Sequence, residues 1–123
     1  MKLLSLTFHV LHVSEKTNWS FVHLTSTDGL NGWGECSLNG WELLQREYAL
    51  KFAAELGSCT FATTADVAVL CRLHLHSPGG LIEHSVKSAT EQAMLDLLAQ
   101  RDSVPVWRLF GDARRPGVEV YAN

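Results

Sequence analysis

This sequence of 123 residues has few cysteines, a small net charge and no long apolar run. The three cysteines, Cys36, Cys59 and Cys71, form no Cys-x-x-Cys pair, which argues against a disulfide framework and against a zinc knuckle. The net charge of −3 provides no basic surface for nucleic acid or an anionic membrane. No run approaches the ~18 apolar residues of a membrane span. We therefore expect a cytoplasmic protein with reduced thiols and with neither a nucleic-acid nor a membrane partner.

The first third of the chain predicts an antiparallel β-meander. In the opening MKLLSLTFHVLHV, polar residues alternate with apolar ones, as in a half-buried strand whose inner face carries Leu4, Leu6, Phe8 and Val10. The run WSFVHLTST predicts a second strand, and Asp28-Gly29 is a strong hairpin signal before the short strand GWGEC. Because a strand and not a helix follows, Gly29, Gly32 and Gly34 are interpreted as turn residues and not as a phosphate cradle.

The remainder of the chain predicts three helices. A stripe at helical spacing ends at Gly57 and consists of Trp41, Leu44, Tyr48, Phe52 and Leu56. The run FATTADVAVLCRLHL predicts a second helix, with Thr63 or Thr64 as its N-cap and Asp66 in its first turn. The third helix is predicted approximately from Glu83 to Arg101, and its apolar surface is wide enough to be covered on more than one side.

A short helical turn ending at Gly111 and a strand-like run, VEVYA, are expected after the third helix. Nothing follows that run with which it could pair, so it reads as the beginning of a further unit. The fold class predicted from these patterns is α+β, a three-stranded antiparallel meander followed by a three-helix bundle.

Two segments together resemble the N-terminal capping domain of the enolase superfamily, in its mandelate racemase/muconate lactonizing enzyme subgroup. They are TSTDGLNGWGE at 25–35 and SATEQAMLDLLAQRDSVPVWRLFGDARRPGVEVYAN at 88–123. The resemblance implies a capping domain over residues 1–113 and the first strand of a truncated (β/α) barrel over 114–123. One departure is the sequence Leu109-Phe110-Gly111-Asp112, where the family usually has Leu-Leu-Gly-Gly.

The resemblance also implies a chemistry that lies outside these residues. Family members abstract the proton α to a carboxylate with a Lys or His base, and Mg²⁺ stabilises the ene-diolate, as in the general case of this superfamily. Base and metal ligands sit at the ends of barrel strands. We therefore expect no catalytic residue, cofactor or metal ligand in this chain, and Mg²⁺ and a carboxylate-bearing small molecule in the full-length parent. The parent would be a racemase, a cycloisomerase or an acid-sugar dehydratase, the missing barrel would be this domain's partner, and a homo-oligomer is expected.

Two loops have the best functional prospects by this resemblance. The connection from Ser14 to Trp19 corresponds to a mobile loop that covers the substrate, and the loop from Cys36 to Trp41 corresponds to a second lid element. Lys16 is placed to meet a substrate carboxylate, and either tryptophan to wall a pocket. The plainer alternative is a solvated lysine and two core tryptophans. The lid candidates are Ser14, Glu15, Lys16, Thr17, Asn18, Trp19, Asn39 and Trp41.

Other polar residues are interpreted as structural. Glu35 is a lone carboxylate that cannot supply paired acid–base catalysis, and we expect backbone amides to satisfy it and a supporting role in the loop. His74 and His76 would diverge by about 200° on a helix, which disfavours a small metalloprotein. His9, His12 and His23 are interpreted as ordinary polar strand residues. The competing functional class is a stand-alone binding or interaction module left by gene truncation.

Overall fold

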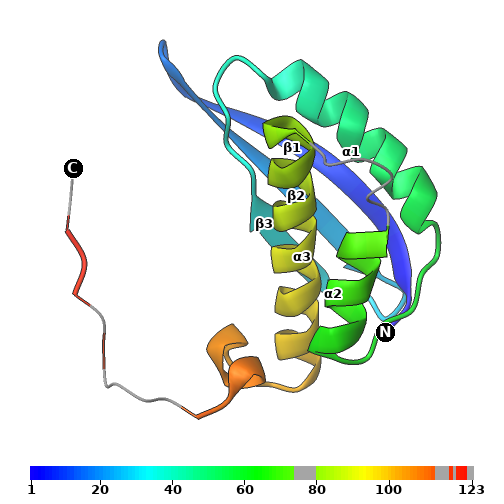
Figure 1. Ribbon diagram of the computed structural model, residues 1–123. Helices are drawn as coiled ribbons and strands as arrows, with labels where there is room; N and C mark the ends of the chain where they lie inside the picture. The colour runs from blue at the N-terminus through cyan, green and yellow to red at the C-terminus, as the bar shows by residue number, and fades with distance from the viewer. Residues whose placement is uncertain (74–79, 113–116, 118, 122–123) are drawn as a thin grey trace.

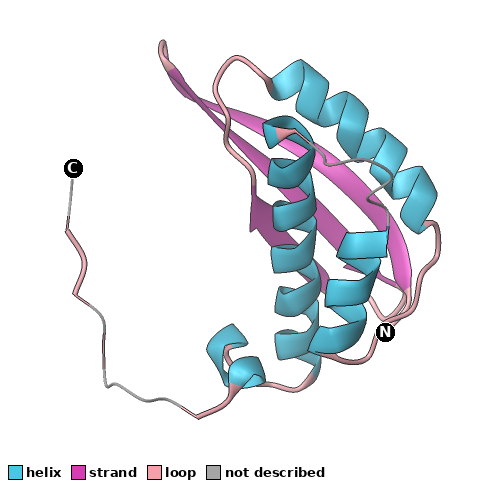
Figure 2. Cartoon of the chain, viewed as in Figure 1, coloured by secondary structure: helices cyan, strands magenta, loops and turns pink. Residues whose placement is uncertain are grey.

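A computed structural model describes residues 1–73, 80–112, 117 and 119–121 of the chain. Three antiparallel strands in the order β1-β2-β3 are followed by three helices, which lie on one face of the sheet (Figures 1 and 2). The predicted α+β meander and helices are confirmed. The elements are β1 (Leu3–Ser14), β2 (Thr17–Ser26), β3 (Asn31–Glu35), α1 (Glu42–Leu56), α2 (Thr64–Leu73), α3 (Leu81–Arg101) and the 3₁₀ helix η1 (Val106–Phe110).

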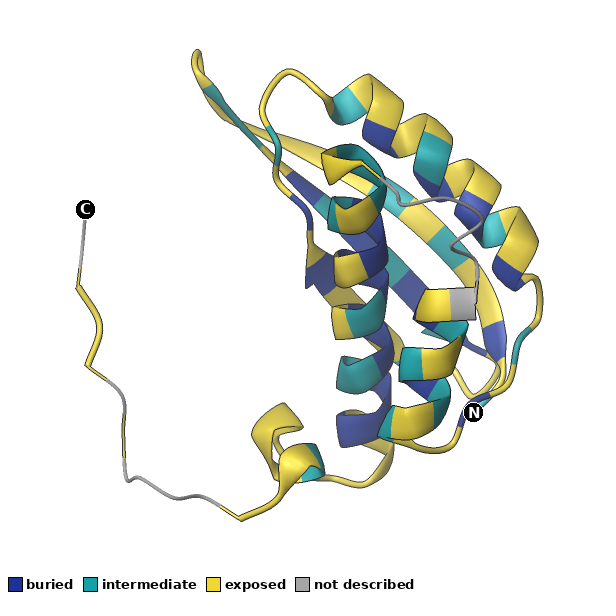
Figure 3. Cartoon of the chain, viewed as in Figure 1, coloured by how far each residue is buried: buried dark blue, intermediate teal, exposed yellow. Residues whose placement is uncertain are grey.

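The hydrophobic core lies between the sheet and the helices, where the buried residues gather in Figure 3. Val22 and Leu24 of β2 belong to the same core cluster as Met94 and Leu97 of α3, and all four are fully buried. Burying side chains of this size contributes roughly 1.5–3 kcal/mol each. No described helix has both the length and the apolar character that crossing a membrane would need.

A β-bulge at the start of β1 overturns one part of the predicted alternation. Leu3 pairs with Ser26 and Ser5 pairs with Thr25, so the ladder skips Leu4. Leu3 is 2% exposed and Leu4 is 66% exposed. The prediction that Leu4 faces the core is wrong, because one extra residue in a strand reverses which side chains face inward.

Helix α1 is present as predicted, but its buried face is rotated from the predicted stripe. The fully or nearly buried positions are Gln45, Ala49, Phe52 and Leu56. Trp41 and Leu44, expected in the stripe, are about half exposed at 47% and 51%. These two side chains instead line a groove, described below. The expected termination is confirmed, since Gly57 has a φ of +51°.

The N-terminus of α2 is a reciprocal cap that resolves the choice between Thr63 and Thr64. The Asp66 N–H donates to Thr63 Oγ1 at 3.2 Å, and the Thr63 N–H donates to Asp66 Oδ2 at 2.9 Å. Thr63 is therefore the N-cap. Asp66 also accepts a hydrogen bond from the Ala62 N–H. This bond, followed by those with Thr63, holds the pKa of Asp66 below its ordinary value.

Strand β3 and helix α3 approach so closely that their backbones touch. A Cβ on Gly32 would lie 2.2 Å from Ala93 O, and one on Gly34 would lie 1.9 Å from Ala89 O. Of the three glycines at 29, 32 and 34, only Gly29, with a φ of +82°, has the backbone conformation of a turn glycine. The interpretation of all three glycines as turn residues is therefore wrong for Gly32 and Gly34, whose missing side chains make room for the helix.

The close approach lets α3 side chains bond to the free edge of β3. The Trp33 N–H donates to Asp96 Oδ2 at 3.2 Å, and the Glu35 N–H donates to Gln92 Oε1 at 3.2 Å. Gln100 Nε2 donates to Asn31 O at 2.7 Å. The bonding residues are four apart on α3 and two apart on β3. Four helical residues rise about 6.0 Å and two strand residues about 6.8 Å, so the two spacings nearly match along the contact. The helix thus takes the place of a fourth strand.

The helical turn predicted to end at Gly111 is present as η1, and Gly111 follows it with a φ of +125°. The described residues of the run VEVYA, Glu119–Tyr121, are assigned to no strand, and Val120 and Tyr121 are 91% and 87% exposed. That this run opens a barrel stays a prediction.

Replacing Gly34 by alanine tests the contact between β3 and α3. We expect Gly34→Ala to lower the free energy of unfolding by about 1–3 kcal/mol, because the new methyl group would push the backbone of α3 away from the strand. Urea denaturation followed by circular dichroism measures this. Gly80→Ala, where nothing lies within 4 Å of the added Cβ, is the matched control and should cost less than about 1 kcal/mol. Equal losses in the two variants would contradict the close-packing explanation.

Candidate functional site

The two loops expected to form a lid lie together at one end of the domain. The β1–β2 connection is shorter than expected: Ser14 ends β1, Thr17–Trp19 begin β2, and only Glu15 and Lys16 form the turn. The loop between β3 and α1 rises to the same end of the sheet in Figure 1. We call these two segments together, residues 14–19 and 36–41, the rim.

Asn39 joins the two halves of the rim with both ends of its side-chain amide. Its Oδ1 accepts a hydrogen bond from the Asn18 N–H at 2.9 Å, and its Nδ2 donates to Lys16 O at 3.1 Å. A primary amide offers the same donor and acceptor as a peptide unit, so Asn39 extends the pairing of β2 beyond the end of β3. The two loops are thereby one connected structure.

Glu42, the first residue of α1, bonds to the rim and was not indicated by the sequence patterns. Its Oε1 accepts from Asn18 Nδ2 at 2.9 Å and from the Gly40 N–H at 3.1 Å. The Asn18 amide, followed by backbone N–H groups, holds the pKa of Glu42 below its ordinary value. On the other side, His12 Nδ1 lies 2.9 Å from Asn18 Oδ1. The available signal was an acidic residue in the first turn of a helix, two residues after Gly40.

The side chains proposed to meet a substrate are accessible. Trp19 and Trp41 are 45% and 47% exposed, so neither is a core residue. Lys16 is exposed, and no ion pair to its ammonium group is found among the described residues. The Lys16 N–H donates to Ser14 Oγ at 3.3 Å, which tightens the turn.

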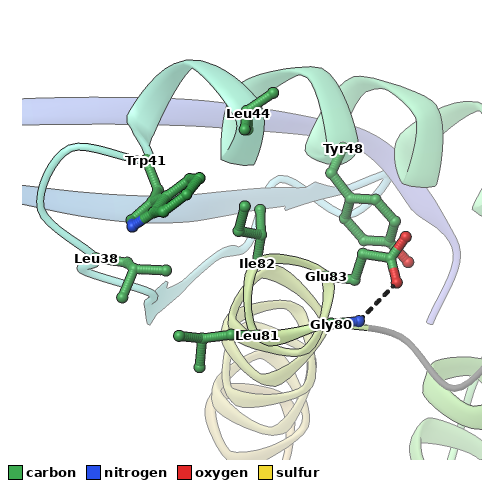
Figure 4. A pocket seen from close by; sticks show the side chains of 8 residues that line it. All are labelled: Leu38, Trp41, Leu44, Tyr48, Gly80, Leu81, Ile82 and Glu83. Carbon is green, nitrogen blue, oxygen red and sulfur yellow. Dashed lines mark hydrogen bonds between the residues drawn. The ribbon is translucent and has the colours of Figure 1, made fainter.

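An apolar groove of about 580 Å³ lies behind the rim, between the β3–α1 loop, α1 and the start of α3 (Figure 4). Its polar groups are few: the Glu83 carboxylate accepts from the Gly80 N–H at 3.1 Å, and burial, with the charges of Glu83 and Glu55, raises the pKa of Tyr48 to about 12. A phenol held protonated in this way is no general base at neutral pH. The groove is lined by Leu38, Trp41, Leu44, Tyr48, Gly80, Leu81, Ile82 and Glu83.

A buried glutamine fixes the root of the rim. Gln45 Nε2 donates to Cys36 O and, at 2.9 Å, to Ser85 Oγ, which connects the loop to α1 and α3. Burial, with a smaller effect of the Glu35 charge, raises the pKa of the Cys36 thiol to about 12. A thiol that stays protonated is not a nucleophile.

The other residues considered from the sequence do not form a reactive centre. Glu35 is exposed, and Gln92 holds its backbone, whereas no hydrogen bond to the Glu35 carboxylate is found in the described part of the chain. His74 and His76 lie outside the described residues. Within the ranges that the structure describes, no group of three or more His, Cys, Asp or Glu side chains is placed to hold a metal ion.

Comparison with known proteins agrees with the fold. Residues 6–111 match the family model of the mandelate racemase / muconate lactonizing enzyme N-terminal domain. The chain belongs to this family. A D-mannonate dehydratase from Caulobacter sp. (strain K31) is 28% identical over 110 residues, which cover 86% of this chain and 27% of that protein.

Two solved structures of the superfamily share the domain. The mandelate racemase/muconate lactonizing enzyme-like protein from Roseovarius sp. TM1035 has a TM-score of 0.81 at 25% identity, over 94% of this chain and 31% of its own. An enolase from Agrobacterium radiobacter, described with bound Na and L-malate, has a TM-score of 0.72 at 26% identity, over 91% of this chain and 29% of its own. The chain thus spans 27% to 31% of the length of these three proteins.

Removing the Asn39 amide should loosen the rim locally. In Asn39→Ala we expect the Asn18 amide proton to exchange with solvent about fivefold faster, because one hydrogen bond contributes about 1 kcal/mol. Hydrogen exchange followed by NMR measures this residue by residue. Ser37→Ala is the reciprocal control: Ser37 Oγ accepts from the Ser20 N–H at 3.0 Å, so that variant should accelerate Ser20 and leave Asn18 unchanged. Unaltered exchange at Asn18 in Asn39→Ala would show that the two loops are not joined there.

Proposed function

We propose that this chain is the capping domain of an Mg²⁺-dependent enzyme that abstracts the proton α to a carboxylate, and that its rim covers and selects the substrate. The observation that carries the proposal is the Asn39 bridge, which holds the two loops together at one end of the domain. A lid made of two joined segments closes as a unit. Closing a lid excludes water and strengthens every electrostatic interaction beneath it.

The exposed side chains of the rim suit a carboxylate substrate. Lys16, at the tip of the β1–β2 hairpin, supplies an ammonium group whose three donors can meet a carboxylate. Trp19 and Trp41 supply large flat surfaces that are about half exposed. In this proposal Lys16 binds and orients the substrate, and the tryptophans shape the space that it occupies.

The proposal places the magnesium ion and the catalytic base outside this chain. Mg²⁺ requires oxygen donors in near-octahedral array, and the described residues contain no such cluster. In this proposal the described residues supply no ligand to the magnesium ion, and their contribution is to bind, orient and enclose the substrate. The exposed Val120 and Tyr121 lie where the family resemblance would begin a barrel, and we propose that domain as the partner of the rim.

Among the reactions that the family resemblance allows, we favour dehydration of an acid sugar. The support is the D-mannonate dehydratase relative and the enolase structure described with L-malate, a hydroxylated dicarboxylate. Racemisation and cycloisomerisation share the same first proton abstraction and are the alternatives.

The isolated chain should have no catalytic activity. We expect residues 1–123 with Mg²⁺ in D₂O to exchange no α-proton of D-mannonate or L-malate, because the base and the metal ligands are absent from the proposed lid. Proton NMR of the carboxylates measures the exchange, and the full-length Caulobacter dehydratase serves as the positive control. Magnesium-dependent exchange by the purified chain would refute the placement of the catalytic groups outside it.

The lid role itself is tested at Lys16. If the coding DNA continues in frame into a barrel, Lys16→Ala in the full-length enzyme should raise KM about tenfold or more, because a hydrogen bond to a charged group contributes about 1.5–3 kcal/mol. Steady-state kinetics on the preferred carboxylate measures this. Lys51→Ala, an exposed lysine in the middle of α1, is the matched control and should leave KM unchanged. Equal KM values for the wild type and Lys16→Ala would remove Lys16 from the binding role.

A further inference from the structure

A second cluster of polar side chains lies on the face of the sheet that the helices leave open. It contains one histidine on β1 and one on β2, with contacts from neighbouring residues of all three strands. We call it the histidine cluster, and its members are Thr7, His9, His23, Asn31 and Trp33. In Figure 2 the helices all lie on the opposite face of the sheet. The cluster is therefore distinct from the rim and from the groove behind it.

The two imidazole rings converge on one point. His9 Nε2 lies 3.0 Å from Thr7 Oγ1, and His23 Nδ1 lies 3.3 Å from the same oxygen. The ring centres of His9 and His23 are 5.8 Å apart, at an interplanar angle of 56°. One nitrogen of each ring thus lies within 3.3 Å of the same hydroxyl oxygen at the surface of the sheet.

We propose that His9 and His23 bind a borderline divalent cation such as Zn²⁺, with the Thr7 hydroxyl beside them and water in the remaining positions. Neighbouring donors around a tetrahedral zinc ion lie about 3.4 Å apart, close to the 3.0 Å and 3.3 Å separations between Thr7 Oγ1 and the two nitrogens. Two imidazoles on one zinc ion, with bonds of about 2.1 Å, have ring centres roughly 5–6 Å apart. The observed 5.8 Å lies in that range.

His23 is already arranged as a metal ligand would be. Its Nε2 lies 3.0 Å from Asn31 Oδ1, so an oxygen acceptor there keeps the proton on Nε2 and leaves the lone pair of Nδ1 available. Metal-bound histidines usually donate their second nitrogen to such an oxygen. Trp33 stacks on the His23 ring, with centroids 4.2 Å apart and planes within 20°, which fixes its orientation.

The chemistry of the donors decides which cation fits. Imidazole nitrogens suit Zn²⁺, Ni²⁺ and Cu²⁺, whereas Mg²⁺ prefers carboxylate, carbonyl and water oxygens. His9 is exposed, so its Nδ1 can carry the ring proton in contact with water while Nε2 binds the ion. With two protein nitrogens the site is open, unlike the closed four-ligand sites of structural zinc. It is independent of the magnesium that the proposed function places outside this chain.

Titration of the purified chain, residues 1–123, with zinc chloride tests the proposal. We expect the imidazole ¹⁵N signals of His9 and His23 to shift together, and the melting temperature to rise with zinc concentration, as for any ligand that binds the folded state. His9→Gln and His23→Gln should each raise the apparent Kd at least about tenfold, and Asn31→Ala should raise it about tenfold, since loss of such a partner typically costs 10–100-fold in affinity. Magnesium chloride should shift neither signal.

Matched controls separate this site from other possible ligands. His12→Gln and Asn18→Ala alter a similar surface pair, with His12 Nδ1 2.9 Å from Asn18 Oδ1, and should leave zinc affinity unchanged. His23 alternates along β2 with the buried Val22 and Leu24, and His9 contacts the His23 ring, so both histidines lie on the open face of the sheet. The variants should therefore remain folded, and circular dichroism checks this. Zinc affinity that is unchanged in both His9→Gln and His23→Gln would overturn the proposal. So would zinc-induced shifts confined to other histidines.

Discussion

The contact between the glycines of β3 and the alanines of α3 is the constraint on which the rest of the domain depends. Because Gly32 and Gly34 carry no side chain, the backbone of α3 rests directly on the strand at Ala93 and Ala89. That depth of approach puts the polar side of the helix within hydrogen-bonding reach of the strand edge. It also fixes the direction in which β3 ends, and therefore where the loop toward α1 begins.

From this base the structure becomes progressively less constrained toward the rim. The root of the β3–α1 loop is held by a fully buried Gln45, whereas Asn18, Asn39 and Glu42 bond to one another near the surface. Hydrogen bonds in contact with water contribute little net free energy each, so such a segment opens more easily than the core. This gradient suits the lid role proposed for the rim, because the root is fixed while the outer part is held by weaker bonds.

Sequence periodicity was sufficient for the order and type of the elements up to Gly111, because alternation at two residues and recurrence at three to four residues follow directly from strand and helix geometry. It failed where one residue changes the register, as at Leu4, whose bulge leaves no compositional mark. The role of Gly34 was likewise invisible, because a glycine near a turn and a glycine under a helix are the same letter. Asn18 and Asn39 were found through family resemblance, but the role of Glu42 depends on its contact with Asn18, 24 positions away in the sequence.

The side chains of α3 along β3 have a consequence for how the protein behaves in a crowded solution. An uncovered strand edge invites the backbone of another chain to add to it, which is a common beginning of fibrous aggregates. Here Asp96, Gln92 and Gln100 already occupy that edge with groups that a foreign strand cannot displace without losing several bonds. The β3 edge of the sheet is therefore protected against addition of a strand from another chain. A β-barrel protects its edges by closing the sheet on itself, whereas here the side chains of α3 cover the edge.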